Sequence, residues 1–290
     1  MTIERTQRGP RVNSRVVQCQ SLAAAAAVKV EVWFTPGVRP APRRLGRARL
    51  LLLSNGYPPG GGRYLQHALT VLAEALAGVR QVAFVPYAQR DWDRHTAVMA
   101  DALEPIGVDV VGVHRSASPA AFMRSAEAVL VGGGNAFRLL AAVYRLDLVH
   151  VIRSRVGEGV PYIGSSAGTN IACPTIRTTN DMPIVEPPSL AALGLIPFQV
   201  NPHYPRRETL AGYLGETRDQ RIAEFLEDND VPVLALREGC WIEVTGASAT
   251  IGGVAGARLF QRAATPRDLP PGADVSDLLR TPIRFDRSTD

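Results

Sequence analysis

Short apolar runs alternate along the chain with longer segments whose apolar residues recur at helical spacing. The continuous apolar runs predict buried strands, at residues 50–53, 82–86, 108–113, 128–131 and 162–164. The helical spacing predicts the intervening helices, at residues 64–77, 92–103, 119–126 and 135–144, with Ser118 placed to cap the third. Continuous apolar strands separated by amphipathic helices indicate an α/β fold, with a mostly parallel sheet and helices on both of its faces.

Changes in composition divide the chain into three predicted parts. Residues 1–47 read as a basic, disordered leader, residues 48–262 as the catalytic α/β domain, and residues 263–290 as a loosely packed or disordered tail rich in Pro, Asp and Arg. In a parallel sheet of this kind, active sites lie outside the carboxyl ends of the strands. The glycine-rich elements of the chain follow the predicted strands, so we expect the site at that edge.

The positive charge lies almost entirely in the leader. The net charge is +5, but residues 1–49 alone carry +8, so the remaining residues carry −3. The folded body therefore gives no electrostatic reason to expect a nucleic-acid partner. The apolar runs fall far short of the roughly 20 residues that span a bilayer, so no membrane is expected. A signal peptide is disfavoured because Lys29 and Glu31 interrupt the alanine-rich stretch of the leader.

The cysteines are few and far apart. Cys19, Cys173 and Cys240 show no paired spacing, which argues against a disulfide framework or a zinc site and favours a reducing compartment. We therefore expect a cytoplasmic protein. No H-E-x-x-H motif and no cluster of ligand-type residues indicates a metal, and no cofactor is expected.

The stretch Gly164-Ser165-Ser166-Ala167-Gly168 fits the G-x-S-x-G pattern of a nucleophile elbow. It follows an apolar strand and precedes a plausible helix start, which is the context that the motif requires. A turn this sharp accepts only small neighbours and lifts the central hydroxyl beside the amides of the helix N-terminus. We expect Ser166 to be the nucleophile and Ser165 a flanking residue. The alternative is a glycine-rich turn with two incidental serines.

A second glycine-rich turn, Gly132-Gly133-Gly134-Asn135, follows the strand at residues 128–131. The amide of Gly134 could form an oxyanion hole together with the amide of Ala167. A phosphate cradle is the weaker interpretation because no Gly-Lys-Ser/Thr or G-x-G-x-x-G pattern follows. A purely structural tight turn remains open.

A serine nucleophile needs a general base, for which His203 is the favoured candidate. Pro202 and Pro205 predict a rigid extended loop around it, whereas the other histidines are expected to be structural or at the surface: His67, His95, His114 and His150. An acid should orient the imidazole, and there are two candidates. Glu238 follows the apolar strand predicted at residues 233–236, and Asp181 lies in the run at residues 177–183. The residues alone do not separate these two, and either could be a solvated loop carboxylate.

Several of these motifs together resemble the peptidase E family of α-aspartyl dipeptidases. The most specific is CPTIRTTNDMPIV at residues 173–185; the others lie at residues 131–135, 162–168, 201–203, 215–222 and 238–241. The similarity extends from about residue 50 to residue 253. It implies a flavodoxin-like fold similar to class I glutamine amidotransferases, with a serine in place of the usual cysteine. It also implies a triad of Ser166, His203 and Glu238, with Asp181 as second-choice orienter.

The resemblance further implies a serine-type dipeptidase that hydrolyses small Asp-X peptides through an acyl-enzyme. Arg177 is the candidate partner for the aspartyl carboxylate, because a guanidinium binds carboxylates in a bidentate manner. A homodimer is allowed. The alternatives are a cyanophycinase-like peptidase acting on aspartate-arginine polymers, a glutaminase-type amidotransferase, and a non-catalytic homologue. The chain departs from the family pattern in its leader, in its tail and at Ser165, where a bulkier residue such as Trp is expected.

Overall fold

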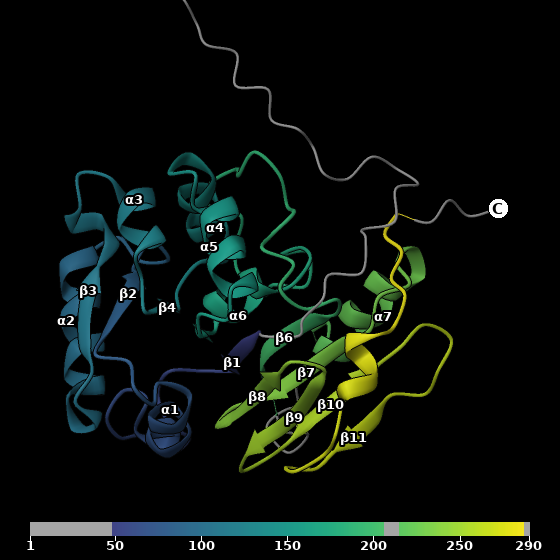
Figure 1. Ribbon diagram of the computed structural model, residues 1–290. Helices are drawn as coiled ribbons and strands as arrows, with labels where there is room; N and C mark the ends of the chain where they lie inside the picture. The colour runs from purple at the N-terminus through teal and green to yellow at the C-terminus, as the bar shows by residue number, and fades with distance from the viewer. Residues whose placement is uncertain (1–47, 206–214, 287–290) are drawn as a thin grey trace, which may run out of the picture. The chain divides into compact units, whose positions relative to one another are not determined.

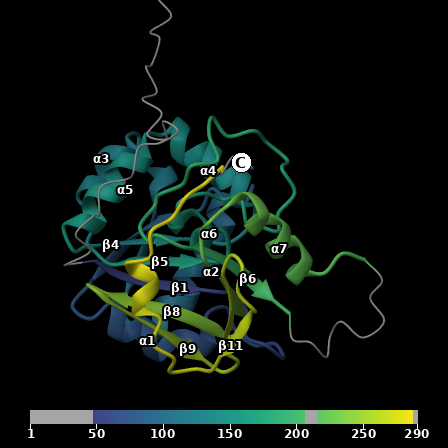
Figure 2. The ribbon, with the colours of Figure 1, turned by 90° about the vertical axis from the view of Figure 1, so that its right-hand side faces the viewer.

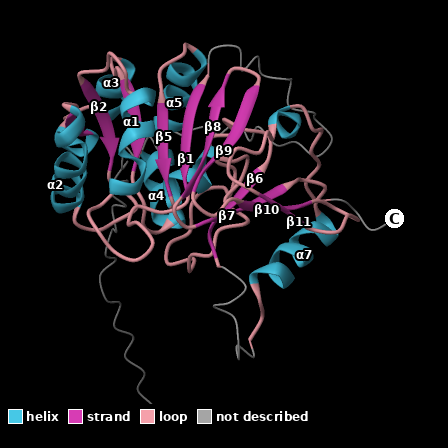
Figure 3. Cartoon of the chain, turned by 90° about the horizontal axis from the view of Figure 1, so that it is seen from below, coloured by secondary structure: helices cyan, strands magenta, loops and turns pink. Residues whose placement is uncertain are grey.

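The computed structural model describes residues 48–205 and 215–286, so the predicted leader at residues 1–47 lies outside the described part. The described residues form two sheets (Figure 1). The larger has seven strands in the order β3-β2-β4-β5-β1-β8-β9. Its strands are β1 Arg49–Leu53, β2 Gln81–Val85, β3 Asp109–Gly112, β4 Ala128–Val131, β5 Tyr162–Ser165, β8 Cys240–Thr245 and β9 Ser248–Gly253. Strands β3, β2, β4, β5 and β1 are mutually parallel; beyond β1, β8 pairs antiparallel with β1, and β9 pairs antiparallel with β8 (Figure 3).

Helices cover both faces of this sheet, as the apolar pattern predicts. Successive side chains of a strand point to opposite faces. Leu51 and Leu53 of β1 accordingly join one buried cluster with α1 Leu69–Ala75 and α2 Trp92–Leu103, while Leu50 and Leu52 join the opposite cluster. The helices of that second face are α3 Pro119–Arg124, α4 Ala136–Arg145, α5 Leu148–Gly157 and α6 Ala167–Ala172. The predicted α/β fold with a mostly parallel, two-sided sheet is confirmed.

A smaller sheet of four strands, ordered β11-β10-β7-β6, follows in the second half of the chain (Figure 2). Its strands are β6 Gln199–Tyr204, β7 Val233–Arg237, β10 Ala257–Phe260 and β11 Arg267–Leu269. Strands β6 and β7 are parallel. Helix α7 Arg218–Asp228 begins with a capping box and buries Ile222 and Leu226 against this sheet. Short 3-10 helices occupy Gln66–Ala68, Glu104–Ile106, Val113–Arg115 and Ser276–Leu279. Among the described helices, none is long and apolar enough to cross a membrane.

Three local expectations differ from the structure. The helix expected from residue 64 begins only at Leu69, because Leu65 adopts a left-handed backbone with φ of 59° that a helix cannot contain. Ser118 makes no side-chain capping bond to α3. The described part of the tail is not loosely packed: Val275 and Leu278 are buried in the main core, and Ser276 accepts a hydrogen bond from the amide of Ala249. Burial of these few apolar side chains is enough to hold the segment against the core, although most residues around them are polar.

Candidate active site

The turn between β5 and α6 has the geometry of a nucleophile elbow. Ser166 has φ 53° and ψ −106°, outside the regions favoured by L-residues. Its flanking glycines are required by close backbone approach: a Cβ at Gly164 would lie 2.6 Å from the carbonyl oxygen of Gly168, and one at Gly168 would lie 2.2 Å from that of Val131. The tight turn therefore holds a strained serine at the carboxyl end of a central strand, as expected for a nucleophile.

Ser166, His203 and Glu238 are connected by hydrogen bonds. The Oγ of Ser166 lies 2.9 Å from Nε2 of His203, and Nδ1 of His203 lies 3.0 Å from Oε1 of Glu238. A carboxylate only accepts hydrogen bonds, so Nδ1 carries the proton and Nε2 is left to accept from the serine hydroxyl. The side chains of His203 and Glu238 are 40% and 52% exposed, which leaves the imidazole accessible from solvent. This is the arrangement of a serine nucleophile with an oriented base.

The backbone around His203 is a strand with an irregularity rather than the predicted extended loop. His203 lies in β6, with a φ of 57°, at a shift of register between Asn201 and Tyr204. Because β6 is parallel to β7, the two strands end side by side, with Tyr204 opposite Arg237. Glu238 is the next residue after β7, and this neighbourhood brings it to the imidazole. The prolines do not prevent pairing, since a bulge already interrupts the ladder there.

Asp181 lies elsewhere. Its Oδ2 accepts a hydrogen bond of 2.7 Å from the amide of Ala136, the first residue of α4, and one of 3.1 Å from Oγ1 of Thr179. Asn135 also reaches this segment, donating from Nδ2 to the carbonyl oxygen of Met182 at 2.8 Å. The geometry therefore gives Glu238 the contact with the imidazole and gives Asp181 a contact with the N-terminus of α4.

The second glycine turn lies against the nucleophile. A Cβ at Gly133 would be 3.2 Å from Cβ of Ser166. Gly134 has a φ of 137°, and a Cβ there would meet the carbonyl oxygen of Ala88 at 2.5 Å, so this position requires glycine. Within the described residues, the amides of Gly134 and Ala167 have no protein acceptor, whereas the neighbouring amides of Gly132 and Asn135 are bonded to Val85 and Ala88. Two amides beside the nucleophile are thus available to a developing oxyanion.

Arg177 is occupied by the C-terminal segment. Both terminal nitrogens of its guanidinium contact the carboxylate of Asp286, NH2 at 3.0 Å from Oδ2, and the group lies 5.5 Å from the centre of the Phe285 ring. The predicted assignment of Arg177 to a substrate carboxylate is therefore not supported, because a protein carboxylate already takes the bidentate position. This pairing was invisible in the sequence, since the two residues belong to segments that only the fold brings together.

Tyr64 is a site neighbour that sequence reasoning missed. The sequence pattern places it in a helix, yet it lies ahead of the helix, partly buried and beside Ser165 and Gly133. Burial raises the pKa of Tyr64, and the nearby Ser165 hydroxyl and Gly133 amide partly oppose that rise. A built Cβ at Gly56 would lie 2.0 Å from the Tyr64 ring, so this glycine makes room for the tyrosine.

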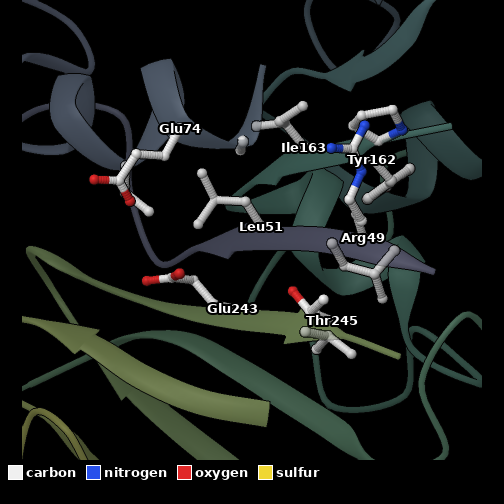
Figure 4. Close-up of a pocket in the computed structure, with 12 residues that line it drawn as sticks. Arg49, Leu51, Glu74, Tyr162, Ile163, Glu243 and Thr245 are labelled. Atoms are coloured by element: carbon white, nitrogen blue, oxygen red, sulfur yellow. The ribbon is translucent and has the colours of Figure 1, made fainter. Parts of the chain in front are cut away.

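A separate cavity of about 200 Å³ lies at the opposite end of the parallel strands (Figure 4). Its lining includes Arg49 at the start of β1, Tyr162 at the start of β5 and Thr245 at the end of β8. Ser166 follows the other end of β5. This cavity is therefore distinct from the place where Ser166, His203 and Glu238 meet.

Comparison with known proteins identifies relatives over nearly the whole described body. The sequence profile of peptidase family S51 matches residues 50–252. The chain is 52% identical over 240 residues to peptidase E of Streptomyces coelicolor, covering 83% of this chain and 98% of that protein. It is 46% identical over 234 residues to a protein of Drosophila melanogaster named probable alpha-aspartyl dipeptidase, covering 80% and 97%. The crystal structure of a peptidase from an acI-B1 Actinobacterium shares the fold, with a TM-score of 0.58 at 13% identity, covering 79% and 98%.

Proposed function

The chain belongs to peptidase family S51, and we propose that it is a serine dipeptidase that hydrolyses Asp-X dipeptides through an acyl-enzyme intermediate. Relatives named peptidase E and probable alpha-aspartyl dipeptidase align over almost their full lengths, which supports this activity. The single structural observation that carries the proposal is the 2.9 Å contact between Ser166 Oγ and His203 Nε2, continued to Glu238 at 3.0 Å. The substrate is a small peptide.

In the first half of the reaction, His203 Nε2 takes the proton of the Ser166 hydroxyl as Oγ attacks the carbonyl carbon of the aspartyl residue. The C–N bond then breaks, and the imidazolium gives its proton to the departing amine of the second residue. Glu238 keeps the imidazole in the required tautomer and stabilises its cation. In the second half, a water molecule gives a proton to His203 and attacks the acyl carbon. The bond between this carbon and Oγ then breaks, and the imidazolium returns the proton to Oγ, which releases aspartate and restores the serine.

The amides of Gly134 and Ala167 are proposed to stabilise the oxyanion of each tetrahedral intermediate. Both lack a protein acceptor within the described residues, and the turn containing Gly134 lies against Ser166. Fixed backbone donors need no reorganisation when charge develops on the substrate, and the loss of one such donor typically costs roughly 100- to 1,000-fold in kcat.

A glutaminase of the cysteine type is disfavoured by the cysteines themselves. Cys173 lies closest to the elbow in sequence, but burial raises the pKa of its thiol to about 12, and its sulfur accepts a hydrogen bond from the amide of Val200. Cys240 is also buried, and its sulfur accepts from the amides of Ala255 and Gly256. Both thiols are structural and free, which also supports a reducing, cytoplasmic location.

The decisive experiment compares the wild type with Ser166→Ala on three substrates: Asp-Leu, glutamine and an aspartate-arginine polymer. We expect release of leucine from Asp-Leu by the wild type alone. Ammonia from glutamine would indicate the amidotransferase alternative, release from the polymer the cyanophycinase-like one, and no turnover of any substrate a non-catalytic homologue. Hydrolysis of Asp-Leu that survives in a folded Ser166→Ala variant would refute the mechanism.

A further inference from the structure

The end of β1 contacts the backbone of all three triad segments through consecutive residues. The carbonyl oxygen of Leu53 accepts hydrogen bonds from the amide of Ser166 at 3.0 Å and from Oγ1 of Thr169 at 2.7 Å. The hydroxyl of Ser54 accepts from the amide of His203 at 2.9 Å. Oδ1 of Asn55 accepts from the amide of Gly239, the residue after Glu238, at 2.7 Å. The segments that carry the nucleophile, the base and the acid are thus all hydrogen-bonded to residues 53–55.

This attachment coincides with unfavourable backbone conformations. Ser166 and His203 have φ values of 53° and 57°, in the left-handed range that non-glycine residues rarely occupy. Such conformations persist only where the surrounding structure holds them. For Ser166 the tight elbow and its glycines provide part of that restraint. For His203 there is no elbow, so its restraint must come from other contacts.

The amide of His203 depends on Ser54 for its hydrogen bond. The shift of register in β6 between Asn201 and Tyr204 removes the intervening residues from regular pairing with β7. A backbone amide that folding shields from water without a partner is costly, and the environment of the His203 amide is partly buried, so a bulge here needs an acceptor from outside the sheet. The Oγ of Ser54 supplies it and also donates to the carbonyl oxygen of Leu236 in β7 at 2.8 Å. One hydroxyl therefore connects the end of β1 with β6, which carries the base, and with β7, which directly precedes the acid.

Ser54 is well suited to this role because it is enclosed. Its side chain is fully buried, with 0% exposure, so water does not replace the hydroxyl. Its own amide donates to the carbonyl oxygen of Cys240 at 2.9 Å, which fixes its backbone against β8. Neither the elbow motif nor the triad residues include it, and its hydroxyl contacts no group that reacts.

We propose that Ser54 is a positioning residue for the general base: its hydroxyl holds the His203 backbone in the left-handed conformation that aims Nε2 at Ser166. The inference rests on the proposed function, in which His203 is that base. Loss of the hydroxyl leaves the His203 amide without an acceptor and lets the bulge relax. A displacement of the imidazole by about 1 Å is enough to reduce the rate of a reaction about 100-fold. Substrate binding does not use this hydroxyl and stays as it was.

The test compares Ser54→Ala with Thr175→Val as a matched control. Thr175 is also buried, and its Oγ1 accepts a hydrogen bond of 2.7 Å from Nε2 of Gln199 at the start of β6, away from the triad. Each variant removes a buried hydroxyl next to β6. We measure kcat and KM for Asp-Leu, the rate at which a fluorophosphonate labels Ser166, and the melting temperature. We expect Ser54→Ala to lower kcat and the labelling rate about 10- to 100-fold with KM within about twofold, and Thr175→Val to change neither rate by more than about twofold.

A folded Ser54→Ala enzyme with kcat and labelling rate within about twofold of the wild type overturns the inference, and so does an equal loss in Thr175→Val. If Ser54→Ala does not fold, Ser54→Cys takes its place, because a thiol is a weak acceptor of similar shape and should give an intermediate kcat. The failure of the proposed function is recognised separately, by Asp-Leu hydrolysis that survives Ser166→Ala. If that variant is inactive while Ser54→Ala is unaffected, only the positioning role fails.

Discussion

Oδ2 of Asp181 lies 2.7 Å from the amide of Ala136, the first residue of α4, and not beside the imidazole of His203. Helix α4 begins directly after the glycine turn whose Gly133 lies against the nucleophile. A carboxylate is stabilised by the free amides and the dipole at a helix N-terminus, and it fixes the chain that enters the helix. Asp181 therefore contacts the helix that follows the glycine turn, whereas Glu238 contacts the imidazole of His203.

This separation predicts different consequences for the substitutions at position 181. Asp181→Ala removes the acceptor of the Ala136 amide, so we expect a fall in melting temperature together with a loss of kcat of about 10-fold or more, since the turn with Gly134 is loosened. Asp181→Asn keeps a carbonyl oxygen that can accept the same hydrogen bond. Its melting temperature and its kcat should therefore both fall less than those of Asp181→Ala. Steady-state kinetics and thermal unfolding of the two variants check this. Equal kcat in both variants would contradict the role of the hydrogen bond.

Glu238→Gln tests the other side of the site. The amide can donate to Nδ1 of His203 and so favour the wrong tautomer, as in serine proteases whose triad acid is replaced by an amide. We expect kcat for Asp-Leu to fall about 10- to 1,000-fold with KM little changed, less than for a buried acid because the Glu238 side chain is 52% exposed and water can replace part of its effect. Glu224→Gln, at an exposed position of α7, is the control. If Glu238→Gln changes kcat by less than twofold, a group other than Glu238 orients the imidazole of His203.

Arg177→Gln distinguishes a structural arginine from a substrate ligand. Because its guanidinium is paired with Asp286, we expect KM for Asp-Leu to change by less than about twofold and the melting temperature to fall slightly, as is usual for a solvent-accessible ion pair. Asp286→Asn should have the same small effect on stability. A KM raised about tenfold by Arg177→Gln alone would show instead that the arginine binds the aspartyl carboxylate.

Gly134→Ala tests the need for glycine in the turn after β4. Its φ of 137° is strained for alanine, and the added Cβ would lie 2.5 Å from the Ala88 carbonyl oxygen, so we expect a loss of roughly 1–3 kcal/mol of stability or more and little residual activity. Gly157→Ala is the matched control, since a Cβ there meets nothing within 4 Å. At that position alanine should leave kcat unchanged. Urea denaturation measures the stability of both variants, and steady-state kinetics measure their kcat. Equal values in the two variants would contradict the need for glycine at position 134.

Local patterns were sufficient for most of the larger sheet and for the elbow. The strand at Ala128–Val131 and the helix at Trp92–Leu103 have the predicted bounds, because apolar runs and helical spacing are properties of neighbouring residues. The serine followed from a motif whose steric needs are equally local. The family resemblance then chose Glu238 over Asp181, which the patterns alone did not.

Several of the missed features depend on contacts between segments distant in sequence. Ser54 acquires its role because β6 and β7 come to the end of β1, and nothing around position 54 announces a bulge at His203. The partner of Arg177 likewise comes from the last described residues. The tail was expected to be loose from its composition, yet Leu278 fills a place in the core that only the folded β9 creates. Composition describes the average of a segment, whereas burial is decided by single residues.

His95 provides a prediction about stability rather than activity. Its side chain is buried edge-on against Phe84, and Nδ1 donates to the carbonyl oxygen of Pro86 at 3.2 Å. Burial lowers the pKa of His95 below its ordinary value of about 6.5, an effect that the Pro86 hydrogen bond only partly opposes. As the pH falls below about 6.5, the unfolded chain therefore takes up a proton that the folded protein resists, and the folded state loses stability by up to about 1.4 kcal/mol per pH unit.

His95→Phe keeps an aromatic ring but removes the titrating group, so its free energy of unfolding should fall less than that of the wild type between pH 7.5 and 5.5, even if it is lower at pH 7.5. Urea denaturation at these two pH values measures the difference, with His150→Phe, which removes an exposed imidazole, as the control. An unchanged slope in His95→Phe would mean that the acid sensitivity arises from other groups, among them His67, whose pKa is also lowered by burial.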